Sequence, residues 1–296
     1  MKRYPAPALP GWLDEMVPFT RYRVDVGEGL QMHVMEQGEG RPVLLFHGNP
    51  TWGFLYRKVA QRLADEKLRL IMPDLIGLGF SDRPPARGDH TLDNHSRWMA
   101  RLLESLEVDD AVAVVQDWGG PIGLHAFSRR PGTMTGLVVM NTSLTKPKPG
   151  FKPTLFHRVF STRVGDMMNR YLGLPQRVLS IAQGDGSSIS GQVSKAYVYP
   201  LGGGRGSEAV TALVRMVPSD MEHPTVAALG VVEELVKGFQ GRSAIVWGDK
   251  DPILGRLRRR HERLLPRARV TPTQAGHFLQ EEVPDEIAGA IRHVAD

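Results

Sequence analysis

The sequence predicts an α/β fold with a mostly parallel sheet that carries helices on both faces. Short apolar runs rich in β-branched residues alternate along the chain with segments of helical periodicity, which is typical of this class. The chain has 296 residues, 41% of them hydrophobic, which is enough for one large core with an insertion. A charged fraction of 23% and the lack of any long polar tract predict a globular protein.

Eight strands are expected from these apolar runs. The first two are joined by Gly27-Glu28-Gly29, a turn that predicts an antiparallel hairpin at the edge of the sheet. The others are expected to be parallel. The predicted strands are 21–26, 30–36, 42–46, 68–72, 111–116, 136–141, 243–247 and 268–271.

A helical cap is expected after the sixth strand, where the alternation stops for about 100 residues. We therefore divide the chain into a first core segment at 1–144, a cap at 145–222 and a second core segment at 223–296. Ligands of open α/β sheets bind outside the carboxyl ends of the strands, so the cap is expected to cover a site there. Its apolar residues are candidates for the pocket lining or for packing between helices: Met167, Met168, Leu172, Leu174, Val178 and Leu179.

Composition narrows the possible partners. The net charge of +5 comes partly from the basic run 256–263, which is expected to be a solvated helix face because no nucleic-acid-binding module accompanies it. The absence of cysteine excludes disulfides and thiolate chemistry. Three prolines within the first ten residues do not fit a signal peptide, and no apolar run of about 18 residues predicts a membrane span. We expect a cytoplasmic protein that binds neither nucleic acid nor membrane.

Asp117 is the most informative residue, because it lies where the strand 111–116 turns sharply into a helix beginning near Gly119. In this arrangement the corner residue is exposed at the carboxyl edge of the sheet, where a hydrolase carries its nucleophile. A carboxylate is ionised near neutral pH and attacks an electrophilic carbon without a base. A simple helix cap is the alternative for this position alone.

The loop after the third strand, His47-Gly48-Asn49-Pro50, ends at the same sheet edge. The backbone N–H groups of Asn49 and Trp118 are expected to form an oxyanion hole beside Asp117. Their side chains add an amide and an indole N–H, which suit an anionic leaving group. A turn residue before proline and a packing aromatic are the alternatives for these two positions.

His277 and Asp251 complete a candidate triad. They follow the last two strands, and the chain order 117, 251, 277 is that of nucleophile, acid and histidine in α/β-hydrolases. Asp74 lies in a loop whose glycines do not match a dinucleotide fingerprint, so a structural turn is expected there. The remaining histidines lack metal-ligand spacing, and the sequence suggests no metal site and no cofactor.

Four motifs together resemble the haloalkane dehalogenases from about residue 25 to the C-terminus: 47–51, 116–120, 248–251 and 275–278. The resemblance implies that Asp117 is the nucleophile and His277 the base. It implies that Asp251 is the acid, because the family's other acid position is occupied by Asn141. Asn49 and Trp118 are expected to hold the halide. The combination is similar to the third subfamily, with Val115 in place of the usual first glycine of the elbow.

The cap sequence bears on the expected halide site in two ways. Pro200, in Tyr199-Pro200, resembles the cap proline that the family places against the halide. None of the five tryptophans lies in the cap, which disfavours a halide site built from two tryptophans.

The resemblance implies hydrolysis of a small apolar haloalkane to an alcohol and a halide through an alkyl ester on Asp117. Epoxide hydrolases are an alternative, with Tyr171, Tyr197 and Tyr199 as candidate acids, and so is a β-lactone decarboxylase of olefin biosynthesis. A binding protein of the same fold would be expected to have a damaged triad. Association of several copies into an oligomer is left open, with the basic run as a candidate contact.

Overall fold

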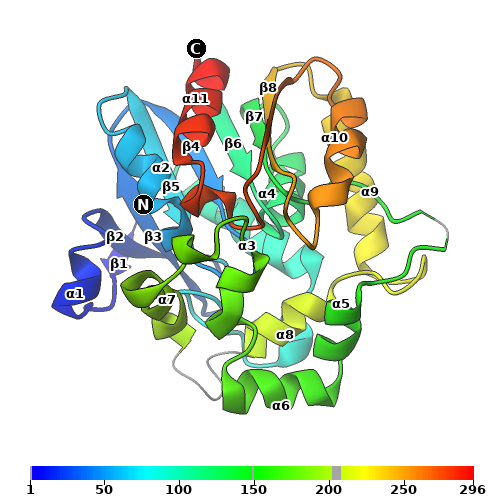
Figure 1. The fold of residues 1–296 in the computed structure, drawn as a ribbon. Helices are drawn as coiled ribbons and strands as arrows, with labels where there is room; N and C mark the ends of the chain where they lie inside the picture. Colours follow the sequence, from blue (N-terminus) through cyan, green and yellow to red (C-terminus); the bar gives the residue numbers. More distant parts are fainter. Residues whose placement is uncertain (1, 149, 202–207) are drawn as a thin grey trace.

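A nine-stranded, mostly parallel sheet forms the centre of the computed structural model, which describes residues 2–148, 150–201 and 208–296. The strand order is β1-β2-β3-β5-β4-β6-β7-β8-β9 (Figure 1). The pairs β1–β2, β2–β3 and β3–β5 are antiparallel, and all other neighbouring strands are parallel. The strands are β1 Arg3–Pro5, β2 Thr20–Asp25, β3 Gln31–Gln37, β4 Arg41–Phe46, β5 Leu68–Pro73, β6 Ala111–Val115, β7 Met134–Val139, β8 Arg242–Gly248 and β9 Arg269–Thr273.

All eight expected strands occur, but the sheet has nine strands, because β1 was not predicted. Strand β1 is a three-residue edge strand that pairs with β2, and it ends in a proline. A segment this short shows no alternation of apolar residues, so only its pairing defines it as a strand. The expected hairpin is confirmed as β2 and β3, with Gly27 and Gly29 at φ angles of 84° and 73° in the turn between them.

Helices cover both faces of the sheet, as expected (Figure 1). Successive residues of a strand point to opposite faces, so Val43 and Leu45 of β4 pack toward one helical layer and Leu44 and Phe46 toward the other. The first layer contains α2 (Arg57–Arg62) and α11 (Pro284–Ala295), and the second contains α3 (Leu92–Ser105), α4 (Gly119–Ser128) and α9 (Thr225–Gly238). Of the short helices, α1 (Gly11–Asp14) contributes Leu13 to the core of the first layer, and α10 (Arg258–Leu264) packs against β8, where the His261 and Trp247 rings lie 4.9 Å apart.

The cap lies over the carboxyl edge of the sheet, between β7 and β8 in the chain (Figure 1). It contains α5 Leu155–Phe160, α6 Arg163–Leu172, α7 Gly191–Val198 and α8 Glu208–Arg215. Strand β4 lies between β5 and β6, so the chain leaves β4 toward one side of the sheet and returns on the other. Such a switch point opens a crevice at the carboxyl ends of β4 and β6, directly beneath the cap.

A buried ion pair fastens the cap to the core. Arg57 of α2 donates two hydrogen bonds to the carboxylate of Glu281, at 2.5 and 2.9 Å, and the Tyr197 hydroxyl of α7 donates to the same carboxylate at 2.5 Å. The Glu281 side chain is fully buried. Lys58 Nζ lies 3.0 Å from Glu281 Oε2. This cluster joins elements distant in sequence.

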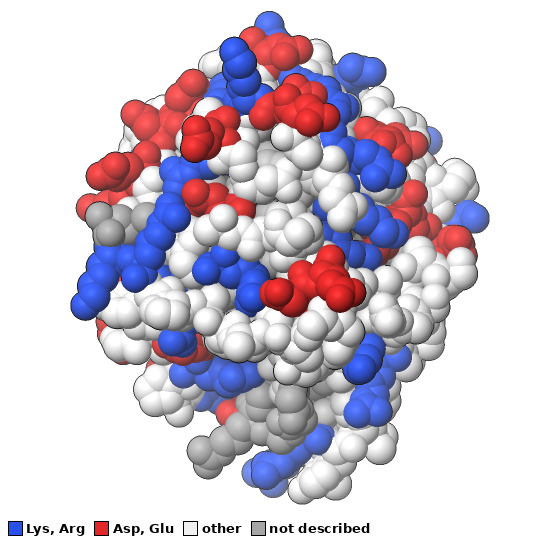
Figure 2. Space-filling view, turned by 90° about the vertical axis from the view of Figure 1, so that its left-hand side faces the viewer, with Lys and Arg blue, Asp and Glu red and all other residues white. Residues whose placement is uncertain are grey.

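Charged side chains of both signs are interspersed on the face shown in Figure 2. No helix among the described residues is long and apolar enough to span a bilayer.

We predict that Arg57→Met lowers the free energy of unfolding by about 3 kcal/mol, because it leaves the buried Glu281 with fewer partners. Lys58 keeps part of the charge paired, which limits the loss. The measurement is equilibrium unfolding in urea. Arg62→Met is the matched control on the same helix, since Arg62 and Asp285 form an exposed pair worth at most about 1 kcal/mol. Equal losses in the two variants would contradict a stabilising role of the buried pair.

Candidate active site

Asp117 occupies a sharp corner between β6 and α4. Its φ angle is 47°, a left-handed conformation that is uncommon outside glycine and that Asp adopts more often than most residues. The Asp117 N–H donates to the Asn141 carbonyl at 2.9 Å, and the Thr142 hydroxyl donates to the Asp117 carbonyl at 2.6 Å. The Asp117 carboxylate accepts from the Asn49 N–H at 2.8 Å, so it faces the neighbouring loop. The helix-cap alternative therefore does not account for its position.

Two glycines allow this close approach. A Cβ at Gly48 would lie 2.2 Å from Asp117 Oδ1, and a Cβ at Gly119 would lie 2.3 Å from the Phe46 carbonyl oxygen. Both distances are far below van der Waals contact. The spacing between the β4 loop and the start of α4 thus requires glycine at both positions.

His277 and Asp251 lie beside Asp117. The His277 Nδ1 is 2.8 Å from Asp251 Oδ2, and its Nε2 is 3.6 Å from Asp117 Oδ2. Asn141 Nδ2 donates to Asp251 Oδ2 at 2.8 Å, and the Ile253 N–H donates to Asp251 Oδ1 at 2.7 Å. The three triad candidates therefore meet at the carboxyl edge of the sheet, and Asn141 holds the acid in place.

Alternating charges set the electrostatics of these groups. Burial raises the pKa of Asp117, against the opposing effects of His277 and of the N–H groups of Trp118 and Asn49. Burial disfavours the His277 imidazolium, but the carboxylates of Asp251 and Asp117 outweigh it and raise the pKa of His277. Burial also disfavours the Asp251 carboxylate, yet its bonds with His277 and Asn141 hold its pKa below the usual value. The two carboxylates therefore stabilise the protonated form of His277.

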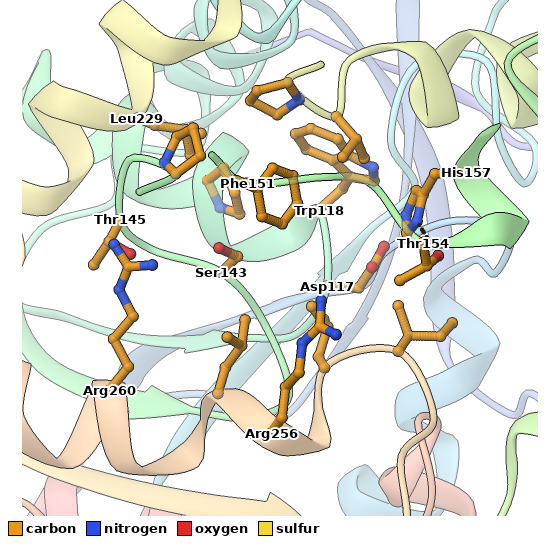
Figure 3. A pocket seen from close by; sticks show the side chains of 17 residues that line it. Asp117, Trp118, Ser143, Thr145, Phe151, Thr154, His157, Leu229, Arg256 and Arg260 are labelled. Atoms are coloured by element: carbon orange, nitrogen blue, oxygen red, sulfur yellow. Dashed lines mark hydrogen bonds between the residues drawn. The ribbon is translucent and has the colours of Figure 1, made fainter. Parts of the chain in front are cut away.

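Of the three residues expected to bind the halide, Trp118 and Asn49 lie at the cavity beside Asp117, whereas Pro200 does not line it. Trp118 lines the cavity beside Asp117, and no hydrogen bond among the described residues uses its indole N–H (Figure 3). The Asn49 amide donates one N–H to the Val210 carbonyl of the cap at 2.9 Å, while its Oδ1 is buried without a partner in the described ranges. Pro200 is not among the residues that line the cavities at Asp117, and its carbonyl accepts from Arg83 instead.

Two adjoining cavities, of about 310 and 360 Å³, contain Asp117 and Trp118. Their lining is largely apolar and includes Ile253 in both cavities. Phe151 and Leu229 line the first cavity (Figure 3). Of the cap residues considered from sequence, Val178 and Leu179 line a cavity, whereas Met167 and Leu172 are 61% and 59% exposed. Helical periodicity defined the apolar positions of the cap but not the direction in which they point.

His157 of α5 is a cavity residue that sequence analysis did not single out. It lines both cavities, and its Nδ1 lies 2.7 Å from the Thr154 hydroxyl. Burial and the nearby charges of His277 and Arg256 lower its pKa to about 4, so it is neutral at pH 7. No sequence motif marked it, because it reaches the site only through the folding of the cap.

Asp74 and His47 support the loops around the site. Asp74 is fully buried against His33 Nδ1 at 2.9 Å and accepts the Gly53 N–H at 2.7 Å. His47 accepts the Leu75 N–H at 2.9 Å. No group of three or more potential metal-ligating side chains occurs in the part of the chain that the structure describes.

The fold and the site define a class of protein: a capped α/β-hydrolase with a carboxylate at the elbow. The α/β-hydrolase fold family model matches residues 41–284. A haloalkane dehalogenase of Mycobacterium marinum is 32% identical over 93% of both chains. A cis-3-alkyl-4-alkyloxetan-2-one decarboxylase of Shewanella oneidensis is 30% identical over 95% of this chain and 90% of the relative.

The overall fold is also that of a solved structure. A tetrameric haloalkane dehalogenase of Paraglaciecola agarilytica superposes with a TM-score of 0.83 at 24% identity, over 99% of this chain and 98% of that one. The chain belongs to the haloalkane dehalogenase family of the α/β-hydrolases. Its assignment to the third subfamily stays a prediction.

We predict that Asp251→Asn lowers the pKa of His277, because the substitution removes the nearest carboxylate that stabilises the imidazolium. The measurement is a titration of the imidazole nitrogens by NMR. Asp249→Asn is the control on the same loop, since Asp249 pairs with Arg258 on the protein surface. An unchanged His277 pKa in Asp251→Asn would show that this carboxylate does not hold the imidazolium.

Proposed function

We propose that this protein is a hydrolase that converts haloalkanes into an alcohol and a halide. The single observation that carries the proposal is the placement of Asp117 in an apolar cavity. Its Oδ1 accepts the Asn49 N–H at 2.8 Å, which leaves Oδ2 facing His277 Nε2 at 3.6 Å. A carboxylate held in this way presents one oxygen for attack on carbon.

In the first step, Asp117 Oδ2 attacks the carbon that bears the halogen. A carbon–oxygen bond forms while the carbon–halogen bond breaks, and the halide leaves with the bonding electrons. The Trp118 indole N–H and the second N–H of the Asn49 amide are proposed as its donors. Exclusion of water by the apolar lining strengthens such bonds. Pro200 is not included, because it lies outside the cavity lining.

In the second step, water hydrolyses the ester. His277 Nε2 takes a proton from water, whose oxygen attacks the Asp117 carboxyl carbon. The Asn49 and Trp118 N–H groups stabilise the oxyanion that develops on Oδ1, and Asp251 stabilises the imidazolium. The imidazolium gives its proton to the departing alkoxide, so the alcohol leaves and Asp117 is left as a carboxylic acid. Asp117 then passes its proton through His277 to solvent, which restores the carboxylate and balances the halide released in the first step.

Epoxide hydrolysis is less well supported by the cavity. The alkoxide formed from an epoxide requires a proton donor, and no tyrosine lines the two cavities within the described ranges. Tyr171 is 72% exposed and Tyr199 is 42% exposed. Tyr197 is buried and donates to Glu281.

Decarboxylation of a β-lactone is a second candidate function, because the decarboxylase of Shewanella oneidensis is nearly as similar to this chain as the dehalogenases are. Such a reaction would use the same carboxylate and the same apolar cavity. The unpartnered indole N–H of Trp118 and the larger number of similar dehalogenases favour carbon–halogen cleavage. Assembly with further copies, as in the tetramer from Paraglaciecola agarilytica, stays a prediction for this chain.

We predict that His277→Phe accumulates the alkyl ester, because this variant retains the Asp117 nucleophile and lacks the base for hydrolysis. Intact-protein mass spectrometry after incubation with 1,2-dibromoethane is expected to show one added bromoethyl group. The double variant Asp117→Asn, His277→Phe is the control and is expected to keep its original mass. An unmodified mass in a folded His277→Phe protein that binds the substrate would refute the two-step mechanism.

We predict that the wild-type protein releases bromide from 1-bromobutane faster than it forms an alkene from a cis-3,4-dialkyl β-lactone or a diol from styrene oxide. The reason is that the Trp118 indole is an N–H donor suited to a halide. Bromide is measured by ion chromatography and the organic products by gas chromatography. Alkene formation without bromide release would establish the decarboxylase instead.

A further inference from the structure

Two arginines of the basic run lie at the mouth of the cavity that contains Asp117. Arg256 and Arg260 both line this cavity, and Figure 3 shows them directed from the same helical segment toward its interior. They are four positions apart, so they share one face of the segment that begins at Gly255 and continues through α10. The expectation of a merely solvated helix face is therefore incomplete.

The positive charge of Arg256 is not neutralised by the protein. Arg256 makes no ion pair or hydrogen bond with any residue in the ranges that the structure describes, and the remaining positions include no aspartate or glutamate. Arg258 on the same segment differs, since it contacts Asp249 at 2.8 Å and Glu262 at 2.9 Å. Arg256 thus presents a free guanidinium at the entrance.

Arg260 adds a second, anchored guanidinium. Its Nη2 donates to the Lys146 carbonyl at 2.5 Å. The carboxylate that acts on it electrostatically is Glu233, which is already paired with Lys237 at 2.9 Å. Arg260 is therefore held in position at the rim while much of its donor capacity remains available.

Asp117 is the sole carboxylate among the residues that line the two cavities around it within the described chain. A neighbouring cavity of about 610 Å³ shares His157 and Val217 with the first and adds the basic side chains of Lys152 and Arg158. Arg215 also lines it, but its charge is paired with Asp166 at 2.8 Å. Basic side chains therefore gather at the entrance, whereas the interior is apolar. A neutral haloalkane uses only the apolar part.

We propose that the substrate of this site carries an anionic end group, such as a carboxylate, that Arg256 and Arg260 bind at the rim while its halogen-bearing carbon lies at Asp117. The inference rests on the proposed function, since it names the class of haloalkane. Arg256 is exposed, so the end group keeps part of its hydration while it accepts charge-assisted hydrogen bonds. An ω-halogenated carboxylic acid combines the apolar chain and the charged end that this cavity matches.

The test compares substrates that differ only in charge at the far end: 6-bromohexanoate, its methyl ester and 1-bromohexane. For the wild-type protein, kcat/KM is expected to be about tenfold higher for 6-bromohexanoate than for the ester, as a charge-assisted hydrogen bond at a partly hydrated site allows. The preference is expected mainly in KM, because the rim contact is the same in the ground state and the transition state. Added salt is expected to reduce it.

In Arg256→Gln, and more completely in the double variant with Arg260→Gln, the ratio of kcat/KM for acid and ester is expected to fall toward one. Arg259→Gln is the matched control, because Arg259 is exposed on the same helix and does not line the cavity, and it is expected to keep the wild-type ratio. An equal loss for acid and ester in Arg256→Gln, or no preference in the wild type, would overturn the inference.

Failure of the proposed function gives a different result. In that case the wild-type protein releases bromide from none of the three compounds and His277→Phe forms no adduct. Calorimetric titration with octanoate then decides the inference by itself, because it needs no turnover. Binding that weakens about tenfold in Arg256→Gln but not in Arg259→Gln supports an anion site, and equal binding to all three proteins overturns it.

Discussion

The hydrogen bond from the Asn49 N–H to Asp117 Oδ1 is the contact on which the rest of the site depends. It joins the loop after β4 to the corner after β6, and these two strands are neighbours in the sheet. The contact needs glycine at positions 48 and 119, since any Cβ would collide with Asp117 or with the Phe46 carbonyl. It also holds Asp117 at a positive φ angle, because the side chain and both backbone groups of this residue are engaged. The orientation of the carboxylate is thus determined by backbone geometry.

Burial of so many charges requires that each has a partner. Asp117, His277 and Asp251 form an alternating series of a carboxylate, an imidazole and a carboxylate, and Asn141 completes the acceptor bonds of the last. An unpaired charge at any of these positions would cost several kcal/mol, roughly the effective penalty of burying one ion. The same principle applies at Glu281, where Arg57 and Tyr197 meet. The cap is therefore fixed to the core by an ion pair that does not include the triad candidates.

The cavity separates two requirements of a substrate. In the proposed mechanism, the apolar interior removes water from the Asp117 carboxylate and from the leaving group, which favours displacement at carbon. The rim of the cavity is basic, because Arg256 forms no ion pair within the described part of the chain and Arg260 donates to a backbone carbonyl. The segment after β8 supplies the charged side chains at the rim. The elbow after β6 supplies Asp117 in the interior.

The sequence by itself determined the features that are local in the chain. The apolar runs predicted every strand except β1, whose three residues are defined by pairing alone. The corner at Asp117 and the order of Asp251 and His277 predicted a triad, because strand ends of a parallel sheet meet at one edge. The tertiary structure decided how the cap packs on that edge. It directs the Asn49 amide to Val210, leaves Pro200 outside the cavity lining, exposes Met167 and brings His157 to the site. It also directs two arginines of the basic run into the entrance, since the rotation of a short helix is set by contacts that no periodicity encodes.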